Sequence, residues 1–391
     1  MTRRDFIARA AAGSAAVALG CRESSSPDPD TPSLDNVIIV TMENRSFDHL
    51  LGWVPGVDGR QAGLSFTDRD GVVQSTYHLQ SPNGCGLIDP DHSYEGGRVE
   101  YNNGKIDGWL IAGSNDLHAI GYYEKNDLPF LGMAATEWLV LDRYFCPLLG
   151  PTFPNRIISV AGQTDRLDNN HSISTLPTIW DRLSAAGKTS RVYGTAVNST
   201  SFWGLRYGSL QRSIADFVTD AANGSLPNVS YVDPELTSDL VNSYHPPGDI
   251  RSGEAFLNTI YKAVTTGPQW KRSLLIITFD EWGGFYDHVV PGTAPIPQGE
   301  KDIGNTDGLR GFRIPTILVS PFVKRRAVSS RVYDHASILK LIETRWNLAP
   351  LTVRDAGAND LMAEIDLTIP VAAAPQFDVT SGPFTVPDGC Q

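Results

Sequence analysis

Short, continuous runs of apolar residues, many of them β-branched, recur along this chain and constrain its fold more than any other feature. Uninterrupted runs of this kind are typical of strands that are buried on both faces of a sheet. Five runs have this character, at residues 36–42, 192–197, 229–232, 273–279 and 314–320. They predict a central sheet that is covered on both sides.

Segments with helical spacing lie between these runs. Residues 178–186, 253–265 and 334–347 carry apolar side chains three and four positions apart, which is the spacing of one helix face. Asp334 stands where a helix N-cap is expected. Strands that alternate with helices predict an α/β fold with a mostly parallel sheet. The irregular, glycine-rich residues 56–128 predict an elaborated insert over that sheet.

The first 21 residues are expected to be an export signal. Residues 2–7, Thr-Arg-Arg-Asp-Phe-Ile, resemble a twin-arginine motif, and a small apolar run follows at residues 10–20. That run is too short to span a bilayer, which takes roughly 20 residues. The sequence therefore predicts export by the twin-arginine route to the periplasm, the cell surface or the medium.

The cysteines leave two questions open. Cys21 follows a sequence that resembles a lipoprotein cleavage site, so it is either lipidated or removed with the signal. Residues 22–33 are then expected to be a polar linker and residues 34–391 the folded domain. Three cysteines remain in that domain, so at most one intramolecular disulfide can form, with its partners undetermined: Cys85, Cys146 and Cys390.

Acidic and amide side chains follow two of the predicted strands. Glu43 and Asn44 come directly after the run at 36–42, and Asp280 and Glu281 come after the run at 273–279. Ligands bind beyond the carboxyl ends of parallel strands, so these side chains are expected to converge. Three carboxylates would repel one another unless a cation lay between them. Oxygen ligands favour Ca²⁺, Mg²⁺ or Mn²⁺ over Zn²⁺.

Thr152 and four histidines complete the candidate chemistry. Thr152 lies in Gly150-Pro151-Thr152-Phe153-Pro154, which predicts a stiff, exposed turn. A threonine hydroxyl beside a divalent cation is a competent nucleophile. Histidines can bind phosphate oxygens or protonate a leaving group, and four are candidates: His92, His245, His288 and His335.

Six segments, in this order, resemble the bacterial phospholipase C / acid phosphatase family, a phosphoesterase branch of the alkaline phosphatase superfamily. They are residues 42–49, 150–156, 245–247, 280–289, 311–315 and 333–339. The resemblance runs from about residue 34 to residue 367 and is much less specific for the substrate than for the branch. Trp282 stands where family members often have histidine, and the chain is shorter than many phospholipase members.

The resemblance implies a three-layer α/β/α sandwich with one divalent metal. Its implied metal ligands are Glu43, Asn44, Thr152, Asp280 and Glu281. It also implies that Thr152 attacks phosphorus and forms a covalent phospho-threonine. His92 and His245 would contact the phosphate or protonate the leaving alcohol, whereas His288 and His335 lie in matching motifs without a settled role.

The expected function is hydrolysis of phosphate esters, in the form of phospholipase C cleavage of phospholipids. The first alternative is an acid phosphatase for small phosphomonoesters, and the second is a surface binding protein that keeps the metal without turnover. Neither Gly-x-Ser-x-Gly nor His-Glu-x-x-His occurs, which argues against a serine hydrolase and a zincin. A net charge of -12 argues against a nucleic-acid partner, while the oligomeric state stays open. Membrane contact is expected only through the substrate or a lipid on Cys21.

Overall fold

An eight-stranded sheet runs through the centre of the fold, in the order β12-β6-β11-β10-β1-β9-β7-β8. Its two middle strands, β1 (Asn36–Met42) and β10 (Ser273–Phe279), are parallel and entirely buried. Parallel strands continue on the β1 side as β9 (Val229–Val232), β7 (Ser190–Tyr193) and β8 (Gln211–Arg212). On the β10 side the sheet continues with β11 (Ile317–Val319), β6 (Leu139–Leu141) and β12 (Ala327–Ser329). Of these, β11 is antiparallel to both β10 and β6, and β12 is parallel to β6.

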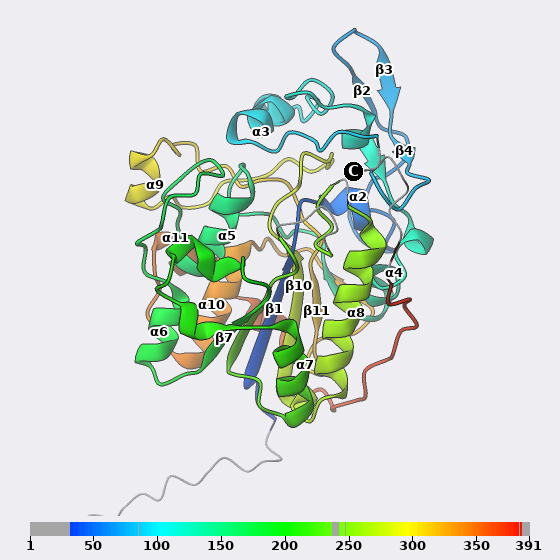
Figure 1. The fold of residues 1–391 in the computed structure, drawn as a ribbon. Helices are drawn as coiled ribbons and strands as arrows, with labels where there is room; N and C mark the ends of the chain where they lie inside the picture. Colours follow the sequence, from blue (N-terminus) through cyan, green and yellow to red (C-terminus); the bar gives the residue numbers. More distant parts are fainter. Residues whose placement is uncertain (1–31, 85, 237–241, 247, 383, 385–391) are drawn as a thin grey trace, which may run out of the picture. The chain divides into compact units, whose positions relative to one another are not determined.

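Helices cover both faces of this sheet (Figure 1). One layer contains α5 (Thr152–Ala161), α6 (Ile179–Ala185), α10 (His335–Trp346) and α11 (Val353–Ala356). The opposite layer contains α7 (Ile214–Asn223) and α8 (Ile250–Thr266). The predicted three-layer α/β/α class with a mostly parallel sheet is therefore confirmed.

The structure describes residues 32–84, 86–236, 242–246, 248–382 and 384. The predicted signal peptide with Cys21 lies outside these residues, as do Cys85, Cys390 and all of the predicted linker except Pro32 and Ser33. From Ser33 onwards the chain forms one unit. Cys146 is buried and free. Among the described residues, no helix is long and apolar enough to cross a membrane.

Each of the five predicted runs overlaps a strand, although β7 begins at Ser190 and already ends at Tyr193, and β11 begins only at Ile317. The three predicted helices are α6, α8 and α10. Asp334 caps α10 as predicted, because its carboxylate accepts a hydrogen bond from the Ala336 N–H at 2.9 Å. Three strands of the central sheet without a prediction, β6, β12 and β8, have only two or three residues each, too few to show a strand pattern.

The segment around Thr152 corrects one prediction. Gly150, Pro151 and Pro154 suggested an exposed turn, but Thr152 is buried and is the first residue of helix α5. Pro154 is tolerated at the third helical position because the first four N–H groups of a helix have no partner within it. The Asn155 side chain donates to the Gly150 carbonyl at 2.7 Å and so holds the preceding loop against the helix.

Residues 56–128 form short elements beyond the carboxyl ends of β1 and β10 (Figure 1). They include β2 (Ser65–Thr67), β3 (Val73–Ser75), β4 (Tyr77–His78), α3 (Tyr94–Tyr101) and β5 (Gly121–Tyr122). Three further short helices lie in loops: α2 (Phe47–Leu51), α4 (Leu131–Glu137) and α9 (Gln298–Asp302). The loop before α3 brings Asp89 and His92 toward the sheet edge where the predicted metal ligands lie.

Candidate active site

The four predicted ligands after β1 and β10 meet at one edge of the sheet. The register places Met42 beside Phe279, so the next residues of both strands are neighbours. The Asn44 N–H donates to Asp280 Oδ1 at 3.0 Å, and the Arg45 N–H donates to the Glu281 carbonyl at 3.2 Å. All four ligand side chains are buried.

Backbone geometry brings these two loops unusually close. Asn44 has φ of 57°, a left-handed conformation that asparagine tolerates better than most residues. Gly283 has φ of +66°, and a Cβ there would lie 2.1 Å from the Asn44 carbonyl oxygen. Only glycine therefore fits at position 283. The indole N–H of the neighbouring Trp282 donates to Glu100 Oε2 at 2.7 Å.

Helix α5 brings Thr152 to the same place. The Thr152 hydroxyl donates to Asn44 Oδ1 at 3.4 Å, and the residue lies at the N-terminus of a ten-residue helix. Free N–H groups and the helix dipole favour a negatively charged group at this position. A phosphate ester bound there would therefore meet both a hydroxyl nucleophile and a favourable field.

Arg156, one helical turn after Thr152, ties α5 to the sheet. Its guanidinium donates to Asp280 Oδ2 and to Asp233 Oδ1, each at 3.0 Å. Burial lowers the pKa of Arg156, but the carboxylates of Asp280 and Asp233 outweigh burial and raise it. The sequence analysis missed this network, although Asp233 directly follows the predicted strand at 229–232 and Arg156 lies four residues after Thr152.

The carboxylates at this edge carry more negative charge than Arg156 can neutralise. Burial raises the pKa of Glu43 to about 7, against the opposing effect of Arg156. Burial likewise raises the pKa of Glu281 to about 8, against the opposing effect of His92. Glu281 Oε1 is buried and has no hydrogen-bond partner in the part of the chain that the structure describes. Such an atom is costly unless a ligand satisfies it.

These residues fit a divalent cation. The set offers carboxylate oxygens, one amide oxygen and one hydroxyl, and it includes the unpartnered Glu281 Oε1. Hard oxygen donors favour Ca²⁺, Mg²⁺ or Mn²⁺. The residues that could hold the ion are those predicted: Glu43, Asn44, Thr152, Asp280 and Glu281.

Two of the predicted histidines lie at this site. His92 Nε2 is 3.2 Å from Asn44 Nδ2 and 3.8 Å from Glu281 Oε1. Burial lowers the pKa of His92, but the charges of Glu281 and Asp89 outweigh burial and raise it to about 9. His245 is more exposed, and its Nε2 lies 3.8 Å from Asp89 Oδ2. Asp89, which the sequence analysis did not single out, thus lies near both rings.

The other two histidines are placed differently. His335 is buried behind the site, with Nε2 2.9 Å from the Asp280 carbonyl oxygen and Nδ1 3.1 Å from the Tyr144 hydroxyl. Both ring nitrogens are thereby engaged, and burial lowers the pKa of His335. His335 is therefore placed to support the Asp280 backbone.

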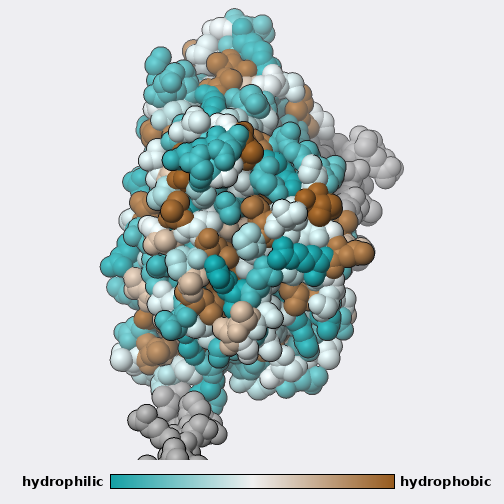
Figure 2. Space-filling model, turned by 90° about the vertical axis from the view of Figure 1, so that its left-hand side faces the viewer, coloured by the Kyte–Doolittle hydropathy of each residue, from teal (hydrophilic) through white to brown (hydrophobic). Residues whose placement is uncertain are grey.

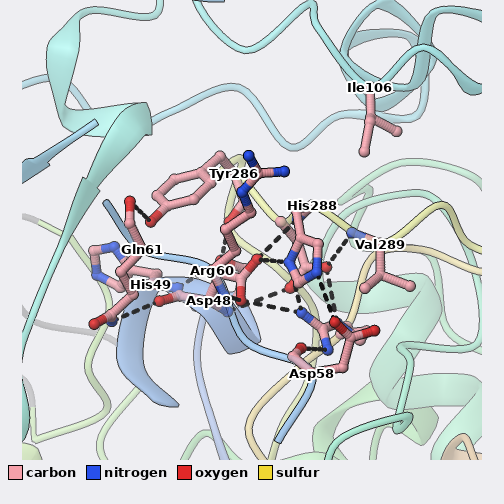
Figure 3. A network of polar contacts seen from close by, with 12 residues as sticks. Asp48, His49, Asp58, Arg60, Gln61, Ile106, Tyr286, His288 and Val289 are labelled. Atoms are coloured by element: carbon pink, nitrogen blue, oxygen red, sulfur yellow. Dashed lines mark hydrogen bonds and ion pairs between the residues drawn. The ribbon is translucent and has the colours of Figure 1, made fainter. Parts of the chain in front are cut away.

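His288 belongs to a separate polar cluster, formed with Asp48, Asp58, Asp287 and Arg313 (Figure 3). Its Nδ1 lies 2.5 Å from Asp48 Oδ2, and its Nε2 lies 3.0 Å from Asp58 Oδ1. Potential ligand atoms of Asp48, Asp287 and His288 lie within 4.8 Å of one another, which also makes a metal site conceivable. However, the Arg313 guanidinium already pairs with Asp48 at 3.1 Å and Asp287 at 2.8 Å, so a cation is supplied from within the chain.

His288 predicts a pH-dependent contribution to stability. Burial lowers its pKa, but the hydrogen bond to Asp48 outweighs burial and raises the pKa above 6.5. The folded protein thus binds this proton more tightly than the unfolded chain, so the stabilisation is complete below pH 6.5 and is lost as pH rises through the raised pKa. Urea midpoints of the wild type and His288→Asn are expected to differ most at low pH and to converge at high pH. A difference that grows with pH would contradict this assignment.

A pocket of about 210 Å³ opens beside Thr152. Its walls are mainly apolar and aromatic, with Phe153 5.0 Å from Phe202 and 5.4 Å from His171 between ring centroids. Glu43, Arg156 and Arg166 contribute its charged side chains. The pocket can therefore hold a small, mostly apolar part of a substrate next to the hydroxyl.

Known proteins resemble this chain over most of its length. A model of the Phosphoesterase family matches residues 34–349. Non-specific phospholipase C6 of Arabidopsis thaliana is 30% identical, with 95% of this chain and 77% of the relative covered. Phospholipase C B of Mycobacterium tuberculosis is 29% identical, with 95% and 86% covered. Non-hemolytic phospholipase C of Burkholderia pseudomallei is 27% identical, with 99% and 68% covered.

Solved structures show a weaker likeness. Phosphonate monoester hydrolase of Agrobacterium radiobacter has a TM-score of 0.41 at 11% identity, with 85% of this chain and 77% of that chain covered. A protein in the alkaline phosphatase superfamily from Vibrio parahaemolyticus has a TM-score of 0.39 at 12% identity, with 85% and 74% covered. Neither likeness bears on the substrate.

Proposed function

The chain belongs to the Phosphoesterase family, and from this premise we propose that it is an exported phospholipase C that works through a phospho-threonine intermediate. Hydrolysis of a phosphoric ester follows from the family and from relatives named phospholipase C. The intermediate, the lipid substrate and export are the proposed parts.

One observation carries the proposed chemistry: the Thr152 hydroxyl lies at the start of α5, 3.4 Å from the amide oxygen of Asn44. In the proposed first step, Thr152 Oγ1 attacks phosphorus and the P–O bond to the leaving alcohol breaks. In the second step, water attacks the phospho-threonine, releases phosphate or a phosphorylated head group, and restores the hydroxyl. The N-terminus of α5 favours the negative charge of the phosphoryl group throughout.

The surrounding residues have distinct parts in this proposal. A divalent cation held by the predicted ligands would lower the pKa of the hydroxyl and neutralise phosphoryl charge. His92, whose pKa is raised to about 9, is protonated at neutral pH and can donate to a phosphoryl oxygen. His245 is more exposed and is proposed to protonate the leaving alkoxide. Arg156 fixes Asp280 and the helix that bears Thr152.

The choice between phospholipase C and acid phosphatase is tested with two chromogenic esters. We expect kcat/KM to be about tenfold or more higher for nitrophenyl phosphorylcholine, a diester, than for nitrophenyl phosphate, a monoester. A chelator is expected to remove both activities, because the cluster of buried carboxylates needs a cation. Preference for the monoester would favour the acid phosphatase, and bound metal without any hydrolysis would favour the binding protein.

Export is proposed from the twin-arginine motif at residues 2–7 and the apolar run at 10–20. Two forms of this proposal remain: Cys21 either carries a lipid that anchors the exported protein or is removed with the signal. Fractionation of the producing cells checks this proposal. Active protein confined to the cytoplasm would contradict it.

A further inference from the structure

Two loops beside the catalytic pocket expose large apolar side chains. Leu205 is 97% exposed, Ile173 61% and Val197 44%. Isolated exposed apolar residues are normal, and Figure 2 shows separate hydrophobic groups among hydrophilic ones on one face of the molecule. These three residues, called the neutral rim below, differ because their loops are joined to each other and to the pocket.

Backbone and side-chain hydrogen bonds join the two loops. The Ser174 N–H donates to the Phe202 carbonyl at 2.8 Å, and the Trp203 indole donates to the Leu176 carbonyl at 2.9 Å. A Cβ at Gly204 would lie 3.6 Å from the Ile173 side chain, so Ile173 lies beside the residue that precedes Leu205. Hydrogen bonds between the two loops therefore fix the backbone that carries the exposed apolar side chains.

Charged residues are missing from both loops. Residues 169–178 and 194–205 contain no Asp, Glu, Lys or Arg, although the whole chain has 32 basic and 44 acidic residues. The nearest flanking charges are Asp168 and Asp181 for the first loop and Arg191 and Arg206 for the second, and Asp181 pairs with Arg206 at 3.0 Å. A surface of this kind is complementary to a partner that is apolar and carries no net charge.

The neutral rim is continuous with the candidate active site. Val197 lines the pocket that also contains Thr152, and Phe202, from the same loop as Leu205, packs on Phe153. A substrate that enters this pocket from a surface touching the rim would reach the hydroxyl directly. Nothing of this kind is needed for a small soluble ester.

We propose that Ile173, Val197 and Leu205 dock the enzyme on a zwitterionic lipid surface, so that a phospholipid enters the pocket without leaving its bilayer. This inference rests on the proposed phospholipase C function. With a net charge of -12 the chain gains no attraction to anionic lipids, so contact has to come from apolar burial. Binding should accordingly be insensitive to salt.

Vesicles of phosphatidylcholine test the proposal. All proteins compared are full-length chains with the substitution Cys21→Ser. This substitution prevents a lipid on Cys21 from anchoring the protein to the vesicles. Leu205→Asp and Ile173→Asp are each expected to lower the vesicle partition coefficient about tenfold, and Leu205→Trp to raise it, because aspartate disfavours and tryptophan favours the interface. Val371→Asp, an exposed apolar position outside these loops, is the matched control and should bind like the parent.

Hydrolysis of soluble nitrophenyl phosphorylcholine separates this inference from the proposed function. Both aspartate variants are expected to keep that activity and to lose activity on vesicles in parallel with binding. Unchanged vesicle binding by both aspartate variants would overturn the docking surface, and so would a lack of vesicle binding by the Cys21→Ser parent protein. Continued hydrolysis of the soluble ester would in that case still support the proposed enzymatic function. Loss of soluble turnover in the parent would instead reject the proposed function.

Discussion

Replacement of Thr152 by valine is expected to abolish turnover while the fold persists. Valine has nearly the same shape but no hydroxyl, and within the described part of the chain the Thr152 hydroxyl makes one hydrogen bond, to Asn44 Oδ1 at 3.4 Å. If that hydroxyl is the attacking atom, kcat should fall by roughly 10⁴-fold or more. Steady-state hydrolysis of nitrophenyl phosphorylcholine measures the loss, and circular dichroism verifies the fold.

A second variant at the same site serves as the control for that experiment. His245→Gln should hydrolyse nitrophenyl esters nearly normally, because nitrophenolate leaves without a proton, but should be slow on esters of alkyl alcohols. Acid quenching of the wild type during turnover of nitrophenyl phosphorylcholine should trap the phosphorylcholine group on Thr152. Full activity of Thr152→Val, or phosphorylcholine trapped on another residue, would reject the phospho-threonine mechanism.

Replacement of Glu281 by glutamine is expected to remove bound metal without destabilising the metal-free protein. Glu281 is completely buried, burial raises its pKa to about 8, and one of its oxygens has no hydrogen-bond partner among the described residues. Because its raised pKa keeps the Glu281 carboxyl mostly protonated and neutral at pH 7 without metal, a neutral amide of the same shape costs the metal-free fold little, whereas the cation loses a charged ligand. We expect metal affinity to fall at least about 10- to 100-fold, with activity falling in parallel. Metal analysis after dialysis and thermal unfolding with chelator measure the two effects.

His288→Asn is the matched control for metal binding. It alters the second cluster, in which Arg313 pairs with Asp48 and Asp287, and should leave metal content unchanged. If His288→Asn loses the metal and Glu281→Gln retains it, the cation belongs with Asp48 and Asp287. The assignment of the catalytic edge would then be wrong.

The sequence predicted those features that depend on residues close together along the chain. The runs at 36–42 and 273–279 are long, continuous and buried, so their strands and the residues after them could be located. The convergence of Glu43 with Asp280 follows from parallel pairing, because the same strand ends then share one edge. The Asp334 cap was likewise visible because it depends on neighbours along the chain.

Features set by distant contacts could not be predicted in this way. Proline on both sides of Thr152 suggested a turn, whereas packing extends a helix from that residue. The partners of Arg156 lie 77 and 124 residues away, at Asp233 and Asp280, and no spacing rule points to them. His288 lies in a motif like that of an active-site residue. In the structure, however, it contacts Asp58 and belongs to the separate cluster that contains Arg313.

The arrangement along α5 also suggests where substrate preference could be re-engineered. Thr152 begins this helix, and Arg156, four residues later, locks it to β9 and β10, so changes there would disturb the nucleophile itself. Ser172 and Val197, in the two neighbouring loops, border the cavity, whereas Ser199 in the second loop donates its N–H to Asp233 Oδ2 at 2.7 Å. Diversity introduced at Ser172 and Val197 alone would retune which alcohol departs and would keep the contact between Ser199 and Asp233.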